Sequence, residues 1–121
     1  MERAITIDGR EIRLRSSAGI PRLYRLKFRR DMMQDIKIIA NAMEKNKENA
    51  QNGVSELPVE ALTLFENVAY LMAKHADQHN VPDSVDEWLD SFETFSIYTV
   101  FPVIQELWAA NLETLNTPVK K

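Results

Sequence analysis

Apolar and polar residues alternate through residues 1–15, on either side of an Asp-Gly pair at positions 8 and 9. Asp-Gly favours a two-residue type I′ turn, because both central residues of that turn need a positive φ. Counting outward from the turn pairs Ile7 with Arg10, Ile5 with Ile12 and Arg3 with Leu14. In this register four aliphatic side chains share one face, namely Ile5, Ile7, Ile12 and Leu14. The pattern predicts a β-hairpin, and because a lone hairpin is marginal in water, it must pack on helices or lend an edge to another strand.

From residue 20 onward, apolar residues recur at three- and four-residue steps, which is the spacing of an amphipathic helix. The stripe begins at Ile20 and continues to about Asn46, and Pro21 suits the first helical turn. Two interpretations stay open. The stripe forms one long helix, or it is divided in two, since Asp31 followed by Gln34 has the form of a helix N-terminal cap.

The polar stretch 45–56 has no apolar periodicity and contains an Asn-Gly pair, so it predicts a mobile loop. Helical spacing of apolar residues resumes at Pro58 and reaches about Gln78, which predicts a second long amphipathic helix. Ser84, three residues before Glu87, has capping-box form and predicts the start of a short helix.

A last helix is expected to carry the apolar residues from Ile97 to Trp108. Pro102 lies inside this stretch and removes one backbone donor, so it predicts either a kink or a helix that starts later. Beyond Leu112 the tail, residues 113–121, is expected to fray.

Together these elements predict a mainly α protein with a small N-terminal β-hairpin, an α+β fold in which the hairpin packs on a bundle of about four helices. A length of 121 residues fits one domain, 1–121, with a hairpin at 1–15, a helical part at 20–112 and the frayed tail.

The chain has no cysteine, which excludes disulfides and thiolate metal sites. No apolar run approaches the ~20 residues of a membrane span, and no signal-peptide pattern is present. We therefore expect a cytoplasmic protein without membrane attachment.

Charge is distributed unevenly along the chain. The net charge is only −3, yet the first 30 residues carry nine Lys or Arg against three acids, and the remainder is correspondingly acidic. Such polarity can steer a partner of opposite sign, or join copies of the chain head to tail as a homo-oligomer.

The chemically reactive side chains form no convincing active site. His75 and His79 have the i, i+4 spacing of zinc-binding helices, but Ala76 stands where a metalloprotease has glutamate, and no third ligand is evident. They are interpreted as two exposed histidines near a helix end.

The acidic residues of 83–90 are interpreted as a solvated or partner-facing surface, because acids are common in a first helical turn. With three glycines and no nucleophile or phosphate-loop motif, we expect no catalytic, cofactor or metal site and no enzyme activity.

Residues 22–30 interleave cations with aromatic residues, as a nucleic-acid-binding surface does. Tyr24 and Phe28 belong to the apolar stripe, however, so the cations lie on other faces of the helix. A small regulator that binds nucleic acid through the basic N-terminal third stays open as the alternative, although the whole chain is acidic.

Residues 86–108 contain both tryptophans and three of the five phenylalanines. Most of these rings are expected in the core, but their number predicts that some remain exposed as a patch. Such a surface is typical of a protein that binds other proteins.

A family likeness is carried by the segments Ile5-Thr-Ile-Asp-Gly-Arg-Glu-Ile12, Ile20-Pro-Arg-Leu-Tyr-Arg25, Phe28-Arg-Arg-Asp31, Phe65-Glu-Asn-Val-Ala-Tyr-Leu-Met-Ala-Lys74, Val85-Asp-Glu-Trp-Leu-Asp-Ser-Phe92, Phe95-Ser-Ile-Tyr98 and Glu106-Leu-Trp108. In these segments the chain resembles the tail assembly chaperones of long-tailed bacteriophages and of prophages in Gram-positive hosts. These segments occur in the right order over nearly the whole chain, and none of them is a catalytic signature.

The resemblance implies a host-cytoplasmic protein that keeps the tape measure protein soluble until tail tube protein assembles around it, and that is absent from the mature virion. A programmed translational frameshift often appends a second domain that recruits tube protein in such families. We expect the partner to be contacted by aromatic residues with a rim of arginines, and this hypothesis names Phe95, Tyr98, Phe101, Trp108, Arg25, Arg29 and Arg30.

Overall fold

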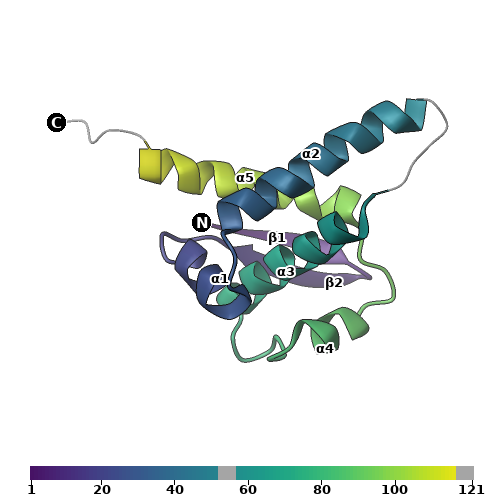
Figure 1. Ribbon diagram of the computed structural model, residues 1–121. Coiled ribbons are helices and arrows are strands. Elements are labelled where there is room, and N and C mark those ends of the chain that lie inside the picture. The colour runs from purple at the N-terminus through teal and green to yellow at the C-terminus, as the bar shows by residue number, and fades with distance from the viewer. Residues whose placement is uncertain (52–56, 117–121) are drawn as a thin grey trace.

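The computed structural model describes residues 1–51 and 57–116 (Figure 1). Within these ranges the elements are β1 (Glu2–Ile7), β2 (Arg10–Arg15), α1 (Ile20–Phe28), α2 (Met32–Gln51), α3 (Val59–Ala76), α4 (Val85–Asp90) and α5 (Ile97–Asn116). The fold is mostly helical with an N-terminal hairpin packed against helices, which confirms the predicted α+β class. None of the described helices is both long and apolar enough to cross a bilayer.

The hairpin has the predicted register. Ile7 pairs with Arg10, and the pairing continues residue by residue to Glu2 and Arg15. Asp8 and Gly9 have φ values of 53° and 74°, which is the positive-φ pair of a type I′ turn. At the open end the Met1 ammonium donates to the Ser16 carbonyl at 2.8 Å, and the Ser16 N–H donates back to the Met1 carbonyl at 2.8 Å.

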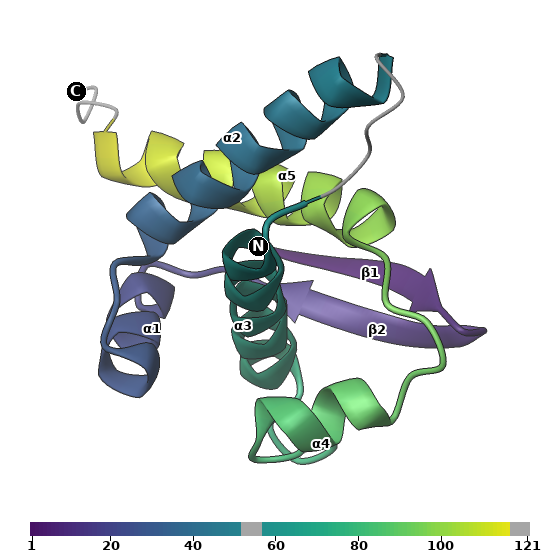
Figure 2. The same cartoon turned by 45° about the vertical axis from the view of Figure 1, so that its right-hand side comes forward.

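Helix α3 is the centre of the fold, because it contacts β2 and each of the other described helices (Figure 2). Its sequence is apolar on most sides, as expected for a helix that is surrounded rather than laid on a surface. The hairpin presents its aliphatic face to this layer, with Ile7 and Leu14 buried, and β1 lies against α5. The hairpin therefore packs on helices, which was one of the two predicted outcomes.

The tip of the hairpin is hydrogen-bonded to the loop between α4 and α5. The Asp8 carboxylate accepts the backbone N–H of Glu93 at 2.6 Å and that of Thr94 at 3.2 Å, together with the Thr94 hydroxyl at 2.8 Å. These hydrogen bonds favour the ionised carboxylate, so the pKa of Asp8 lies below its ordinary value, chiefly because of Thr94. An ion pair between Arg3 and Glu106 joins β1 to α5.

The apolar stripe of residues 20–46 is divided into two helices, α1 and α2, so the single long helix is wrong and its alternative is confirmed. Arg29 ends α1 in the left-handed region, with φ 59° and ψ 36°. Asp31 then caps α2, because its carboxylate accepts the N–H of Met33 at 2.9 Å and that of Gln34 at 3.4 Å. This break explains why five helices are described where about four were predicted.

The corner between α1 and α2 encloses a buried carboxylate, that of Asp35, which is 1% exposed. It accepts the Tyr24 hydroxyl at 2.7 Å, and the Arg30 guanidinium donates to it at 2.8 Å and 2.9 Å. Burial, and then the hydrogen bond to Asp35, raise the pKa of Tyr24. The three side chains tie the end of α1 to the beginning of α2, and every carboxylate oxygen has a donor.

Residues 45–51 are helical, so the predicted loop over 45–56 is wrong in this part, and 52–56 lie outside the described residues. The reason is a contact with a distant segment. Asn46 is buried and its amide donates to the Tyr98 hydroxyl at 2.8 Å, which holds the second half of α2 close to the start of α5.

Helices α4 and α5 follow the sequence pattern with one correction at each end of α5. The Ser84 hydroxyl caps α4 by accepting the Glu87 N–H at 3.1 Å, as predicted. Helix α5 begins at Ile97 and contains Pro102, so the alternative of a later start is wrong. It continues past the predicted limit at 112 to Asn116, and the rest of the predicted tail lies outside the described residues.

We predict that Asp35→Asn lowers the free energy of unfolding by about 2 kcal/mol, because the Arg30 guanidinium loses its charged partner and keeps only one neutral amide oxygen as an acceptor. The half-exposed position of Arg30 keeps the loss below that of a fully buried pair. Urea unfolding of the purified chain measures it. Asp90→Asn, an exposed acid on α4, is the matched control and should leave the midpoint unchanged; equal midpoints for both variants would contradict the prediction.

Candidate partner-binding surfaces

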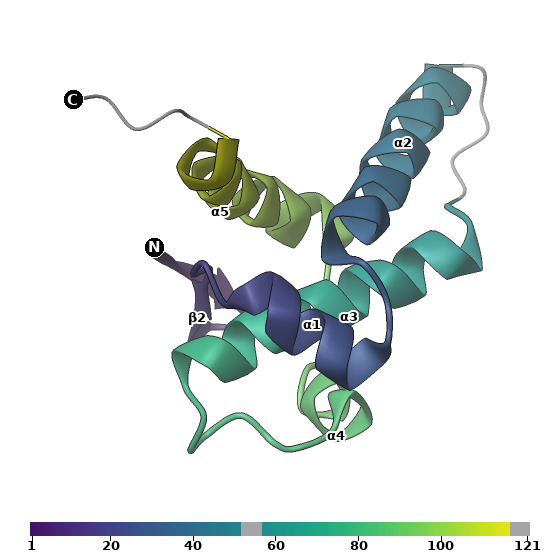
Figure 3. The ribbon, with the colours of Figure 1, turned by 60° about the vertical axis from the view of Figure 1, so that its left-hand side comes forward.

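A groove lies between α2 and α5, with a volume of about 260 Å³. We call it the α2–α5 groove, and its lining consists of Ala40, Met43, Glu44, Lys47, Tyr98, Phe101, Pro102 and Gln105. Figure 3 shows why it forms, since the two helices diverge from one another above α3. Its lining combines apolar side chains with the polar Glu44, Lys47 and Gln105.

Four aromatic residues were predicted to contact a partner, and the structure exposes only one of them. Tyr98 is 56% exposed, at the edge of the α2–α5 groove. Phe95 is half-buried among three other rings, with centroids 5.4 Å from Phe65, 5.1 Å from Trp88 and 5.4 Å from Phe92. Most of the predicted patch is therefore part of the core.

Phe101 and Trp108 are 1% and 6% exposed, so the expectation that they present an exposed surface is wrong. Both lie on the face of α5 that turns toward the core, and the Phe101 ring meets Phe65 edge-on at 6.5 Å between centroids. Phe101 still lines the α2–α5 groove as part of its floor. Helical spacing identified the apolar face of α5. It could not show which part of that helix the neighbouring elements leave exposed.

The three arginines of the predicted rim are all exposed, but they differ in their partners. Arg30 is bound by the buried Asp35 and serves the corner between α1 and α2, whereas Arg25 and Arg29 are not part of that corner. Two leucines beside them are also exposed, Leu23 at 40% and Leu26 at 57%. We call the exposed surface of Arg22, Leu23, Arg25, Leu26 and Arg29 the α1 outer face, and its three arginines make no ion pair within the part of the chain that is described.

The α1 outer face belongs to α1, whereas the α2–α5 groove is lined by residues of α2 and α5 alone, and Figures 1 and 2 show helix α1 below those two helices. The sequence hypothesis combined the aromatic residues and the arginines into one contact surface. In the fold they belong to two separate surfaces.

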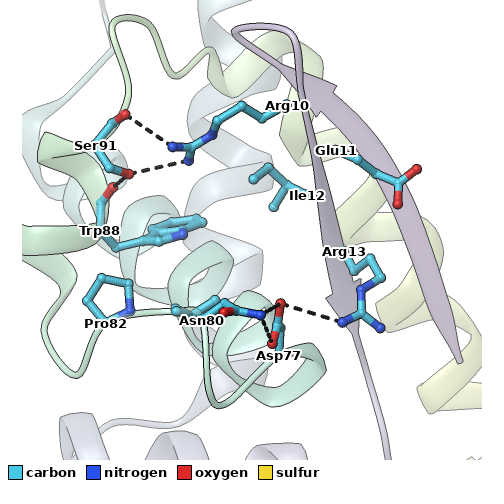
Figure 4. A pocket seen from close by; sticks show the side chains of 10 residues that line it. Arg10, Glu11, Ile12, Arg13, Asp77, Asn80, Pro82, Trp88 and Ser91 are labelled. Atoms are coloured by element: carbon cyan, nitrogen blue, oxygen red, sulfur yellow. Dashed lines mark hydrogen bonds and ion pairs between the residues drawn. The ribbon is translucent and has the colours of Figure 1, made fainter.

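A third hollow, which sequence reasoning missed, lies beside β2 (Figure 4). We call it the β2-edge pocket; its volume is about 310 Å³, and it is lined by Arg10, Glu11, Ile12, Arg13, Asp77, Asn80, Val81, Pro82, Trp88 and Ser91. A pocket between a strand and a loop that is distant in the sequence leaves no periodic signal, and the only hint was the presence of Arg10 and Ile12 on the aliphatic face of the hairpin.

The polar groups of this pocket are loosely engaged. The Arg10 guanidinium lies over the Phe92 ring at 4.3 Å and donates to the Ser91 carbonyl at 3.4 Å and the Ser91 hydroxyl at 3.3 Å. Arg13 lies 3.5 Å from a carboxylate oxygen of Glu2 and 3.5 Å from one of Asp77. All these distances are at the long end for hydrogen bonds and ion pairs, so a competing acceptor can replace them at small cost.

The two histidines do not share a helical face. Helix α3 ends at Ala76, so His79 lies in the turn that follows. His75 is half-buried, and its Nε2 lies 2.8 Å from the Ser17 hydroxyl, so the expectation of two exposed histidines is wrong for this one. Among the described residues no group of three His, Cys, Asp or Glu side chains is placed to hold a metal ion.

The acidic residues near α4 include one ion pair. Asp83 lies 3.0 Å from the Lys74 ammonium, and this hydrogen bond lowers the pKa of Asp83 below its ordinary value. Asp86, Glu87 and Asp90 are exposed along α4, in agreement with a solvated acidic surface.

Comparison with known protein families, with curated proteins and with solved structures found no match for this chain. The surfaces described above therefore carry the functional argument together with the resemblance of the sequence.

We predict that the stability of the fold decreases as the pH falls through about 6.5. Burial, Arg15 and the N-terminal ammonium lower the pKa of His75, and its buried Nδ1 has no hydrogen-bond partner among the described residues. The unfolded chain therefore takes up the proton first, near the ordinary value of 6.5, and protonation favours unfolding. Urea midpoints between pH 8 and pH 5 measure this loss, and His75→Asn should reduce it. The same slope in both proteins would refute the assignment to His75.

We predict that Arg29→Gly raises the free energy of unfolding by about 0.5 kcal/mol, because glycine accepts a left-handed φ without steric cost and this gain exceeds its entropic penalty. Arg29→Val removes the same charge but should lower the free energy of unfolding by about 1 kcal/mol, since a branched side chain opposes that conformation. Thermal unfolding of the two variants makes the comparison. Equal stability would mean that residue 29 does not need a left-handed conformation.

Proposed function

We propose that this chain is a phage tail assembly chaperone, a holdase that binds the tape measure protein and keeps it soluble while tail tube protein assembles around it. The observation that carries the proposal is the α2–α5 groove, an apolar hollow flanked by two helices with an exposed tyrosine at its edge. The ordered resemblance to that family supports the same function.

The shape of this groove suits one side of a helix. Grooves between two diverging helices commonly accept the apolar stripe of an amphipathic helix, with anchors at i, i+3, i+4 and i+7. Met43 and Pro102 offer the apolar contacts beside the buried Phe101, while Tyr98 presents a ring that is large, stiff and open to solvent. A tape measure protein is expected to be a long helix with apolar faces, so repeated weak contacts along it would keep it soluble.

In this proposal the α1 outer face speeds the first encounter with the partner and takes no part in the contact inside the groove. Three arginines without ion partners among the described residues attract acidic stretches from a distance, and Leu23 and Leu26 add apolar contact area beside them. Charge then governs how fast the chaperone meets its partner, while the groove governs how long it stays.

In this proposal the chain acts in the cytoplasm of the bacterial host and leaves before the virion is complete. A frameshifted longer form would carry the domain that recruits tube protein. No enzymatic step is part of the proposal, since holding an apolar partner needs neither a nucleophile nor a metal.

A nucleic-acid-binding regulator is the second candidate, and the α1 outer face is the observation that favours it. Exposed arginines on one helix can contact phosphates, and binding would then weaken steeply with salt. The leucines that share this face and the acidic character of the rest of the chain favour a protein partner instead.

We predict that Tyr98→Ala abolishes solubilisation of the co-expressed tape measure protein, measured as soluble yield and co-purification, because the groove loses its exposed ring. Tyr98→Phe keeps the ring and should keep the activity, although the hydrogen bond from Asn46 is lost.

Val59→Ala is the matched control, since it shortens an apolar side chain that is 78% exposed and lies outside the groove. It should leave solubilisation unchanged. If the wild-type chain folds but leaves the tape measure protein insoluble, the chaperone proposal fails, and salt-dependent DNA binding by the same protein would favour the second candidate.

A further inference from the structure

The outer edge of β2 has no neighbouring strand. The sheet has two strands, so among the described residues β2 pairs with β1 alone. In an antiparallel hairpin closed by a two-residue turn, the flanking residues Ile7 and Arg10 exchange both main-chain hydrogen bonds, and every second pair does the same. The bonds exchanged by Met1 and Ser16 continue this alternation at the open end.

It follows that the main-chain N–H and C=O groups of Glu11 and Arg13 point away from β1. Neither residue makes a main-chain hydrogen bond to another element within residues 1–51 and 57–116. An edge of this kind is a template for a further strand unless something covers it.

The β2-edge pocket lies along this free edge. In Figure 4 β1 runs on one side of β2, and the pocket opens on the other side, toward Trp88 and Pro82. Glu11 belongs to the lining although its side chain points away from the pocket in the same view, so its main chain forms part of the wall. The opposite wall comes from the segment between α3 and α4 and from α4 itself. The result is a slot with a strand edge on one wall and, on the other, the apolar Val81, Pro82 and Trp88 together with the polar Asp77, Asn80 and Ser91.

We propose that an extended segment of a partner protein binds in the β2-edge pocket as a third strand, pairing with the main chain of Glu11 and Arg13. Its side chains opposite Ile12 and Arg10 face into the pocket, because residues two positions apart share one face of a strand. Ile12 is half-buried beside the buried Trp88, so it takes an apolar residue. The Arg10 guanidinium makes no ion pair with any described carboxylate and takes an acidic residue. The segment therefore carries an acidic and an apolar residue two positions apart.

A second copy of this chain fits the edge less well. Two β2 edges could meet only if both copies brought their α4 walls, Pro82 and Trp88 included, into the same space. A single extended segment needs no such room. The inference does not depend on the chaperone proposal, because it uses neither the α2–α5 groove nor the α1 outer face.

The test uses the peptide acetyl-Thr-Asp-Thr-Ile-Thr-Asp-Thr-amide, which offers an acidic residue two positions from the isoleucine in either strand direction. It is titrated to millimolar concentration into the 15N-labelled full chain. Saturating shifts of the Glu11 and Arg13 amides and of the Trp88 indole, with slowed hydrogen exchange at both amides, are expected. Replacing both aspartates by lysine should weaken binding at least tenfold.

Two matched controls test strand pairing itself. Peptides methylated on the isoleucine nitrogen, or on the two neighbouring threonine nitrogens, should differ at least tenfold in affinity, because only one alternating set of amides faces β2. Glu11→Pro removes an outward N–H and should abolish binding, whereas Thr6→Pro, directly across the hairpin and facing its other edge, should not. Should either proline unfold the chain, the methylated peptides decide alone.

Absence of shifts at these residues, or equal affinity for the two methylated peptides, would overturn the proposal. A second copy of the chain at the edge would also overturn it. In that case the Glu11 and Arg13 amides become protected from hydrogen exchange as the protein concentration rises without peptide, and the protein has the mass of a dimer.

Discussion

The carboxylate of Asp35 fixes the angle between α1 and α2, and much of the molecular surface follows from that angle. Arg29 and Asp31 end one helix and begin the next, and because Tyr24 and Arg30 both bind Asp35 from the α1 side of this corner, α1 is held along α3 instead of continuing into α2. Ile20 and Tyr24 then reach the core, and the arginines of α1 turn outward. Helix α2 leaves the corner in another direction and diverges from α5, which opens the groove between them. The corner that this buried acid stabilises therefore lies between the helix that carries the basic face and a helix that lines the apolar groove.

Local chemistry predicted the elements whose cause is local. Asp8 and Gly9 need positive φ, so the turn and the whole register followed from two residues, and Ser84 marked the start of α4. The break at Arg29 was harder to predict, because an arginine in the left-handed region leaves no signal in the composition. Residues 45–51 look like a loop in sequence, and they are helical in a structure where Asn46 bonds to Tyr98, 52 residues away.

The candidate surfaces were less predictable than the fold for a related reason. Aromatic content predicted a protein-binding role, but the exposure of each ring depends on which face of α5 its neighbours cover. In the fold they cover Phe101 and Trp108 and leave Tyr98 exposed. Arg30 could not be told from Arg25 by residue type, since only the position of Asp35 separates them. The β2-edge pocket needed the path of the chain between α3 and α4, which no spacing in the sequence encodes.

The attachment of the hairpin tip has a consequence for synthesis. Asp8 binds Glu93 and Thr94, which follow it by 85 and 86 residues, so the tip cannot dock while the ribosome is still making the middle of the chain. At about 5–20 residues per second this delay lasts roughly 4–17 s. Throughout that time both edges of the newly made hairpin are open to other nascent chains. The charged residues on its outer face, Glu11, Arg13 and Arg15, lie where they can discourage indiscriminate pairing during this delay.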